Sequence, residues 1–492
     1  LRVDIDERPD VAVRYGELGQ PCIAILTPSG EPMECLVDPG ADDLLAAIED
    51  AHTRWSDSRA ELVAEIEAAG EARAEEPQLE RSDLTPALLD VALELTESHR
   101  GAAGPEAVRL WLYAHRRRTD VRAELRARAS IQRRVDGGGV DRESGAFRHC
   151  LEAGGDCDVG RAGTQGEWLS VLARIASEDS EAHEWAFDVV ERVIGYLERE
   201  LLETTGGFLD SPGDDRIFAS ANASVARGLL ACGVAFNRSD WRSRGRTVAD
   251  FILLRLRAGE AGVYHVWDGL PRQLGLLGDQ VACGNAFLDA YEVTGEADFL
   301  AHAQTQVRVI ERQFHTSEGA FGDIDSMHDQ TALLGERRVP LLENAEAAEL
   351  MIRLGHLTHD DRYPAAAYAV LGALAGGVTS AATDIEGVSA LARVTDRLLS
   401  LEPELKVISF SRPTEHDSVG DPLHSEALRL ALAAHTVQRL HPGFDDQLIS
   451  QLGVTGTSSG AYCFVAGEYG SLLTHPDELL SAVERQLSAP SF

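Results

Sequence analysis

The side chains best suited to chemistry in this sequence lie in one glycine–aromatic segment, Gly262-Val-Tyr-His-Val-Trp-Asp268. A neutral imidazole at His265 could act as a general base on an open-chain sugar, with a second group returning the proton. The faces of Tyr264 and Trp267 could stack on a sugar ring and bind it. The alternative is structural, because the same two aromatic side chains could simply plug a space between helices.

Two further polar residues stand at the expected starts of helices. Asp279 follows Gly278, and Asn344 follows Glu343. A polar side chain in this position can cap free backbone amides, which requires no function. On the inner face of a helical ring, Asp279 would also be available to a sugar. We therefore take Asp279 as a second catalytic candidate beside His265, and Asn344 as a substrate-binding candidate.

The sequence offers no complete metal or cofactor motif. The segment Gly322-Asp-Ile-Asp-Ser-Met-His-Asp329 is acidic, but a calcium loop would also need a glycine at its sixth position and a glutamate at its twelfth, which is Leu334. His356 and His359 lack a third ligand. Neither a glycine-rich phosphate loop nor a serine nucleophile elbow is present. We expect no metal ion and no cofactor.

The composition is strongly acidic. The 492 residues include 81 Asp plus Glu against 45 Lys plus Arg, a net charge of −36, and Lys406 is the only lysine. This balance excludes a broad nucleic-acid or anionic-membrane surface and is typical of cytoplasmic proteins that work in high salt. GC-rich codon usage would explain arginine over lysine, but not the acid excess. The uncharged run 364–383 is about as long as a membrane span, but it is rich in small residues and indicates a buried helix and a loop.

The first stretch, residues 1–69, has an α/β pattern. We expect a short strand at 2–6, a helix at 9–15, a strand at 22–26 that ends in the turn 27–30, and a helix at 42–69. Residues 71–81 are highly charged and include Pro77, as in a linker. The first residue is Leu1 rather than methionine, which suggests a fragment.

Residues 82–400 have helical periodicity throughout. About eleven helices are expected there, at 86–97, 106–128, 168–175, 183–202, 223–236, 241–256, 279–293, 297–314, 341–357, 363–375 and 388–399.

A glycine followed by an aromatic residue recurs in the loops of this helical stretch. The aromatic residues are Phe147, Phe208, Tyr264 and Phe321, spaced by 61, 56 and 57 residues. Such a period holds one helical hairpin, and 319 residues hold about 5.6 of them. The sequence therefore predicts an (α/α)6 toroid of six hairpins, with an open solenoid as the competing arrangement. In a toroid, Phe208 and Phe321 would join Tyr264 as substrate-binding candidates.

The last stretch, 402–492, returns to an α/β pattern. Strands are expected at 405–410 and 459–465, and helices at 422–440 and 476–487. The seven cysteines form no Cys-x-x-Cys pair, which fits a reduced compartment.

Several segments resemble the spermatogenesis-associated protein 20 family. They are Val3-Asp-Ile-Asp-Glu-Arg-Pro-Asp10, Leu26-Thr-Pro-Ser-Gly-Glu-Pro32, Gly275-Leu-Leu-Gly-Asp-Gln280 and Pro340-Leu-Leu-Glu-Asn344. The resemblance implies a thioredoxin-like module followed by an α/α toroid related to N-acylglucosamine 2-epimerases. It also implies that Pro21 is the cis-proline that faces a peptide or thiol partner, with the redox Cys-x-x-Cys upstream of Leu1. An ordinary turn proline is the alternative.

This sequence departs from the family where the family's cavity is lined. The His-Phe-Glu-Lys segment expected after Phe147 is replaced by Gly163-Thr-Gln-Gly-Glu-Trp-Leu169, and the acidic segment after Phe208 is reduced to Asp210-Ser-Pro-Gly-Asp-Asp215. Two functions therefore stay open. One is an epimerase-like or isomerase-like enzyme acting on a sugar. The other is an inactive scaffold that binds a sugar or protein partner, or a thiol-redox protein if the Cys-x-x-Cys exists.

Overall fold

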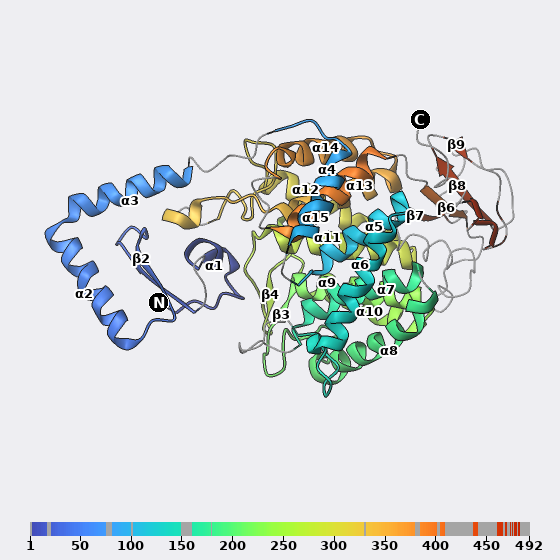
Figure 1. Cartoon of the computed structure of the whole chain (residues 1–492), viewed down its shortest axis with the longest axis horizontal. Helices are drawn as coiled ribbons and strands as arrows, with labels where there is room; N and C mark the ends of the chain where they lie inside the picture. The colour runs from blue at the N-terminus through green and yellow to red at the C-terminus, as the bar shows by residue number, and fades with distance from the viewer. Residues whose placement is uncertain are drawn as a thin grey trace.

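A body of packed helices dominates the computed structural model (Figure 1). The structure describes residues 2–16, 21–74, 81–99, 102–148, 160–178, 180–328, 331–378 and 384–400, and beyond them only short pieces between 404 and 482.

Six helices form the inner ring among these described residues. Each contacts the next one, and the last contacts the first. They are α5 (Pro105–Arg118), α7 (Ala162–Glu178), α9 (Ala219–Ala235), α11 (Leu277–Thr294), α13 (Leu341–Thr358) and α15 (Ile385–Leu399). Because α15 packs directly on α5, the ring is closed and an open solenoid is excluded.

Each inner helix has an outer partner that covers it. The outer helices are α6 (Val121–Arg134), α8 (Ser180–Tyr196), α10 (Ser239–Phe251), α12 (Ala297–Gln313), α14 (Arg362–Ala375) and α4 (Ala87–Ser98). The first of them in the chain, α4, packs on the last inner helix, so the two ends of the ring complete the sixth pair. The apolar core includes fully buried rings such as Trp168, Phe287 and Phe299. These contacts confirm the predicted (α/α)6 toroid.

One expected helix is in fact two. The prediction of a single helix over 106–128 is wrong, because the chain turns between α5 and α6. Thr119 adopts a left-handed conformation with φ of 56°, and the Asp120 carboxylate accepts hydrogen bonds from the backbone N–H groups of Arg122 and Ala123. Asp120 is therefore the N-cap of α6. The break divides this stretch into an inner and an outer helix.

A buried side-chain amide fixes the loop of each glycine–aromatic repeat. Gln165, Asn222, Gln280 and Asn344 each accept a hydrogen bond from a loop N–H and donate one to the C=O of the same loop residue. The loop residues are Phe147, Phe208, Val263 and Phe321. In the third repeat, Val263 therefore takes the place that Phe147, Phe208 and Phe321 take in the others. The sequence pattern assigned this place to Tyr264, which is one residue too late.

The N-terminal stretch contains α1 (Pro9–Tyr15), an antiparallel hairpin of β1 (Cys22–Leu26) and β2 (Pro32–Val37), and the helices α2 (Ala41–Asp57) and α3 (Arg59–Ala74). The expected strand at 2–6 is wrong, because residues 5–7 form a turn. The expected helix at 42–69 breaks at Ser58, and α3 continues to Ala74, inside the expected linker. A thioredoxin-like identity for this stretch stays a prediction.

Four strands are described in the C-terminal stretch. They are β6 (Glu404–Ile408), β7 (Thr436–Leu440), β8 (Gly460–Val465) and β9 (Glu468–Tyr469), in the sheet order β7-β6-β8-β9. The strands expected near 405 and 460 are present. The helix expected at 422–440 is wrong at its end, where β7 pairs in parallel with β6, and its remainder lies outside the described residues. Only parts of the helix expected at 476–487 are described, at 477–479 and 481–482.

Candidate functional site

A cavity of about 900 Å³ lies where the N-terminal ends of the inner helices meet. All six contribute side chains from their first turns, from Glu106 on α5 to Glu386 on α15. Helix N-termini carry a partial positive charge, which favours acidic groups and ligand oxygens nearby. A volume of this size is typical of small-molecule sites. The ring therefore brings together residues that lie about 280 positions apart in the sequence.

Three glutamates in this cavity have no cation within ion-pair distance among the described residues. Burial raises the pKa of Glu167, of Glu343 and of Glu386 to about 7. The Glu386 carboxylate accepts hydrogen bonds from the N–H groups of Glu106 and Ala107, at 2.8 and 3.3 Å. The inner helices surround Glu167, and its side chain is exposed only in the sense that it lines the open space of the cavity. A carboxyl group with a pKa near 7 can both donate and accept a proton at neutral pH.

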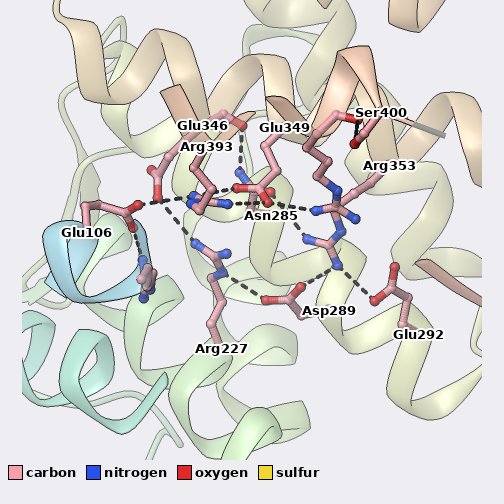
Figure 2. A network of polar contacts seen from close by, with 12 residues as sticks. Glu106, Arg227, Asn285, Asp289, Glu292, Glu346, Glu349, Arg353, Arg393 and Ser400 are labelled. Carbon is pink, nitrogen blue, oxygen red and sulfur yellow. Dashed lines mark hydrogen bonds and ion pairs between the residues drawn. The ribbon is translucent and has the colours of Figure 1, made fainter. Parts of the chain in front are cut away.

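A network of buried ion pairs joins the inner helices (Figure 2), and it reaches the cavity at Glu106, Arg227 and Glu346. We call this network the floor of the cavity. Arg393 of α15 bridges Glu106 and Glu349, with nitrogen–oxygen distances of 3.1 and 2.9 Å. Arg353 of α13 joins Asp289 and Glu292 of α11 at 2.6 and 3.0 Å. These ion pairs link the inner helices α5, α11, α13 and α15 to one another.

Arg227 of α9 connects this floor to the cavity wall. It donates to Asp289 at 2.8 Å and lies 3.6 Å from Glu346, and both Arg227 and Glu346 line the cavity. Burial raises the pKa of Glu346 from its ordinary value, and Arg227 opposes that shift. Wall and floor therefore form one charged unit, in which Glu167, Glu343 and Glu386 are the acids without a cation.

The structure brings the two catalytic candidates into contact. The Nδ1 atom of His265 lies 2.8 Å from Oδ2 of Asp279, and its Nε2 atom lies 2.8 Å from the backbone oxygen of Asp6. Burial lowers the pKa of His265, but the Asp279 carboxylate and the two hydrogen bonds outweigh it and raise that pKa to about 9. Both ring nitrogens therefore donate, and the imidazole is charged at neutral pH. It has no free lone pair with which to act as the expected general base.

The candidates for sugar binding lie outside the cavity wall. Phe208 and Phe321 are at most 1% exposed, and the Asn344 amide is fully engaged by backbone groups of Phe321 and Pro340. Trp267 packs edge-on against Phe251, with ring centroids 6.5 Å apart. Tyr264 packs partly buried against the apolar core. These contacts match the structural alternative for the aromatic residues. Among the described residues, the aromatic ring on the wall is that of Phe218.

Pro21 directly precedes β1 and is exposed. Its backbone oxygen accepts a hydrogen bond from the N–H of Asp38, which closes the hairpin. The bond that would be cis joins it to Gln20, which lies outside the described residues. Cys22 donates from Sγ to the backbone oxygen of Tyr15 and is a free thiol. The role of Pro21 toward a peptide or thiol partner stays a prediction.

The described residues hold no group of three side chains that could bind a metal ion. In the acidic loop near Asp323, the Asp323 carboxylate is paired with Arg14 instead. Within the same part of the chain, none of the helices combines the length and apolar character needed to cross a bilayer.

The three unpaired glutamates were missed by sequence reasoning. Glu167 lies inside Gly163-Thr-Gln-Gly-Glu-Trp-Leu169, which the sequence marks only as a departure from the family pattern. Glu343 was noted as a helix-start residue, and Glu386 carried no signal. The one usable signal is position: each lies within the first six residues of an inner helix.

Comparisons with known proteins identify similar folds and no family. No family model matches the sequence, and no curated protein matches it. One similar solved structure is an unsaturated glucuronyl hydrolase from Bacillus sp. GL1, at 16% identity over 64% of this chain and 95% of that chain, with a TM-score of 0.48. A D-mannose isomerase is 15% identical over 60% and 87%, with a TM-score of 0.46.

A sugar epimerase from a ruminal bacterium gives 14% identity over 57% of this chain and 82% of that chain, with a TM-score of 0.46. The helix contacts of this chain itself establish the toroid fold.

Proposed function

We propose that the central cavity binds a small carbohydrate and that its unpaired glutamates transfer protons on that ligand. The observation that carries the proposal is the set Glu167, Glu343 and Glu386, three carboxyl groups with pKa values near 7 in one cavity of about 900 Å³. Hydroxyl groups of Thr164, Ser170, Ser220 and Ser224 line the same space. Carboxyl and hydroxyl groups are suitable hydrogen-bonding partners for sugar hydroxyls.

The proposed chemistry is acid–base catalysis at a sugar carbon or a glycosidic oxygen. Both epimerisation and glycoside hydrolysis need one group that gives a proton and one that accepts it. A set of carboxyl groups whose pKa values lie near neutral pH supplies both forms at once. In this proposal His265 and Asp279 take a different role from the expected one. They form a fixed pair of charges in the cavity wall and transfer no proton.

The second candidate is an inactive scaffold that binds a sugar or protein partner. It is favoured by one observation, the segment around Asp6 that covers part of the cavity and occupies Nε2 of His265. We also propose that residues 1–69 are part of a thioredoxin-like module related to the spermatogenesis-associated protein 20 family. The hairpin of β1 and β2 followed by α2 supports this assignment. Cytoplasmic location and adaptation to high salt belong to the same proposal and rest on the composition.

A thermal-shift screen with neutral mono- and disaccharides in molar KCl tests the sugar proposal. A ligand that binds only the folded protein raises the melting temperature. We expect at least one sugar to stabilise the full chain, and the shift to be lost in Glu343→Gln. A complete lack of stabilisation across the panel, with the protein folded, would argue against sugar binding and favour a protein partner.

A further inference from the structure

The N-terminal segment, residues 4–14, forms part of the cavity wall. Ile5, Asp6, Pro9, Asp10 and Val13 line the cavity together with the starts of the inner helices. The segment therefore covers part of the cavity, and Asp6 contacts Arg161 and His265 there. We call this covered part of the wall the cavity mouth.

Asp6 is bound at this mouth as a ligand would be. The two terminal nitrogens of Arg161 donate to its two carboxylate oxygens, at 3.0 and 2.5 Å. Its backbone oxygen accepts from Nε2 of His265 at 2.8 Å. A bidentate pair of arginine and carboxylate is both strong and geometrically selective. Arg161 and His265 thus grip a carboxylate and a neutral oxygen of one residue.

The protein holds these two donors in place without help from Asp6. Asp279 fixes the other nitrogen of His265 and itself accepts from the backbone N–H of Ser220, at 3.3 Å. Arg161 also lies 3.5 Å from Asp210, which is 6% exposed and belongs to the toroid. The pair would therefore keep its orientation if another molecule replaced Asp6.

The segment is attached to the toroid by polar contacts. Arg216 pairs with Asp4 at 2.9 Å, Arg14 with Asp323 at 2.8 Å, and His328 with Asp10 at 2.9 Å. The apolar core of the toroid begins at Leu84 and includes no residue of the segment. Asp10 and Arg14 are buried in these contacts, whereas the side chains of Asp6 and Arg161 are 28% and 27% exposed. Partly exposed ion pairs are individually weak and are screened by salt. Asp6 can therefore leave Arg161 while the buried pairs hold the rest of the segment in place.

We propose that Arg161 and His265 form a carboxylate-binding subsite, that Asp6 occupies it as a tethered ligand, and that an acidic sugar of the uronate class displaces Asp6. The sugar part of this inference rests on the proposed function. In aspartate, Cβ and Cα separate the carboxylate carbon from the carbonyl carbon. In a hexuronate, C5 and C4 likewise separate the carboxylate carbon C6 from C3. A uronate can therefore offer its carboxylate to Arg161 and its C3 hydroxyl to His265.

A tethered ligand multiplies the apparent affinity of the site by the fraction of molecules in which the site is free of it. The first test therefore compares the full chain with Asp6→Ala by calorimetric titration of D-glucuronate and D-glucose at matched ionic strength. We expect D6A to bind glucuronate about ten-fold more tightly than the unchanged chain. The control is Asp360→Ala, which removes a partly exposed aspartate paired with Arg362 and should leave the affinity unchanged.

The second test removes the subsite itself. In the double variant Asp6→Ala, Arg161→Gln, we expect the preference for glucuronate over glucose to disappear. A preference that survives this change would overturn the subsite. Equal affinities of D6A and the unchanged chain for glucuronate would overturn the tethered ligand.

A third probe, N-acetyl-L-aspartate methylamide, carries the carboxylate and the backbone carbonyl of Asp6 and no sugar. Binding of this probe to D6A, with no binding of either sugar, would support the subsite but overturn the uronate ligand and the proposed function. Binding of glucose without any gain for the two acidic probes would leave the proposed function standing and overturn the inference.

Discussion

His265 and Asp279 form a buried ion pair in which Nδ1 lies 2.8 Å from Oδ2, although the two residues come from different elements. His265 precedes the short strand β4 (Val266–Trp267), and Asp279 lies in the first turn of α11. The pair therefore ties a loop of one repeat to the inner helix that follows it. It also holds the imidazole in its charged form, which makes His265 a donor at the cavity mouth.

The pair predicts a loss of stability in alkaline solution. The pKa of His265 is about 9 in the folded protein, above the value of 6.5 of a free histidine. The contribution of His265 to the free energy of unfolding is therefore complete below about pH 6.5 and is lost as the pH rises through 9. Denaturant titrations should show that His265→Gln removes up to about 3 kcal/mol of this pH dependence. His99→Gln, at an exposed position, is the control, and an unchanged slope in H265Q would contradict the assignment.

The ion network under the cavity predicts a large effect of removing one cation. Arg393→Met leaves Glu106 and Glu349 buried without one of their partners. Removing one member of a buried pair typically costs about 3–5 kcal/mol. We therefore expect R393M to lower the free energy of unfolding by that amount. Arg362→Met, whose side chain is 89% exposed, should have almost no effect. Similar stabilities of the two variants would show that the network is not coupled to folding.

The amide contacts in the repeat loops predict that Asn344 is a structural residue. Asn344→Ala leaves the N–H and C=O of Phe321 without these side-chain partners in a buried loop. Each unsatisfied group costs about 1–3 kcal/mol, so we expect a total loss of about 2–6 kcal/mol. Gln132→Ala, on the exposed face of α6, serves as the control. A stable N344A variant that has lost only sugar binding would restore the substrate-binding role expected from the sequence.

The net charge of −36 predicts a strong dependence on salt. At about 0.01 M salt the Debye length is ~30 Å, so carboxylates across the surface repel one another, whereas at 1 M it is ~3 Å. Circular dichroism melts at roughly 0.05 M and 2 M KCl should therefore show a clearly higher melting temperature in the second. Equal melting temperatures would show that the acid excess serves solubility alone.

Periodicity predicted the ring because the repeat is a local property of the chain. The spacing of Phe147, Phe208 and Phe321 reflects one helical hairpin each, and the structure confirms six pairs. The assignment of the third repeat to Tyr264 was wrong because the loop position is defined by the amide of Gln280, which lies 17 positions from Val263 in sequence. Local pattern alone could not identify Val263 as the residue that this amide binds.

The cavity could not be predicted in the same way. In a chain with 81 acidic residues, Glu167 and Glu386 have no distinguishing local feature. They become a site only because ring closure brings the starts of all six inner helices together. The contact of Asp6 with Arg161 spans 155 positions, which no local pattern can reveal.

The most direct test of the central claim is a calorimetric titration of the sugars selected by the thermal-shift screen, carried out at pH 6 and pH 8 with the unchanged chain, Glu167→Gln and Glu184→Gln. Glu184 is an exposed residue of α8 and provides the matched control. We predict that the affinity of the unchanged chain changes between the two pH values, because the pKa of Glu167 lies near 7. We also predict that E167Q binds at least about ten-fold more weakly, while E184Q is unaffected. A sugar that binds E167Q and the unchanged chain equally well at both pH values would contradict the account.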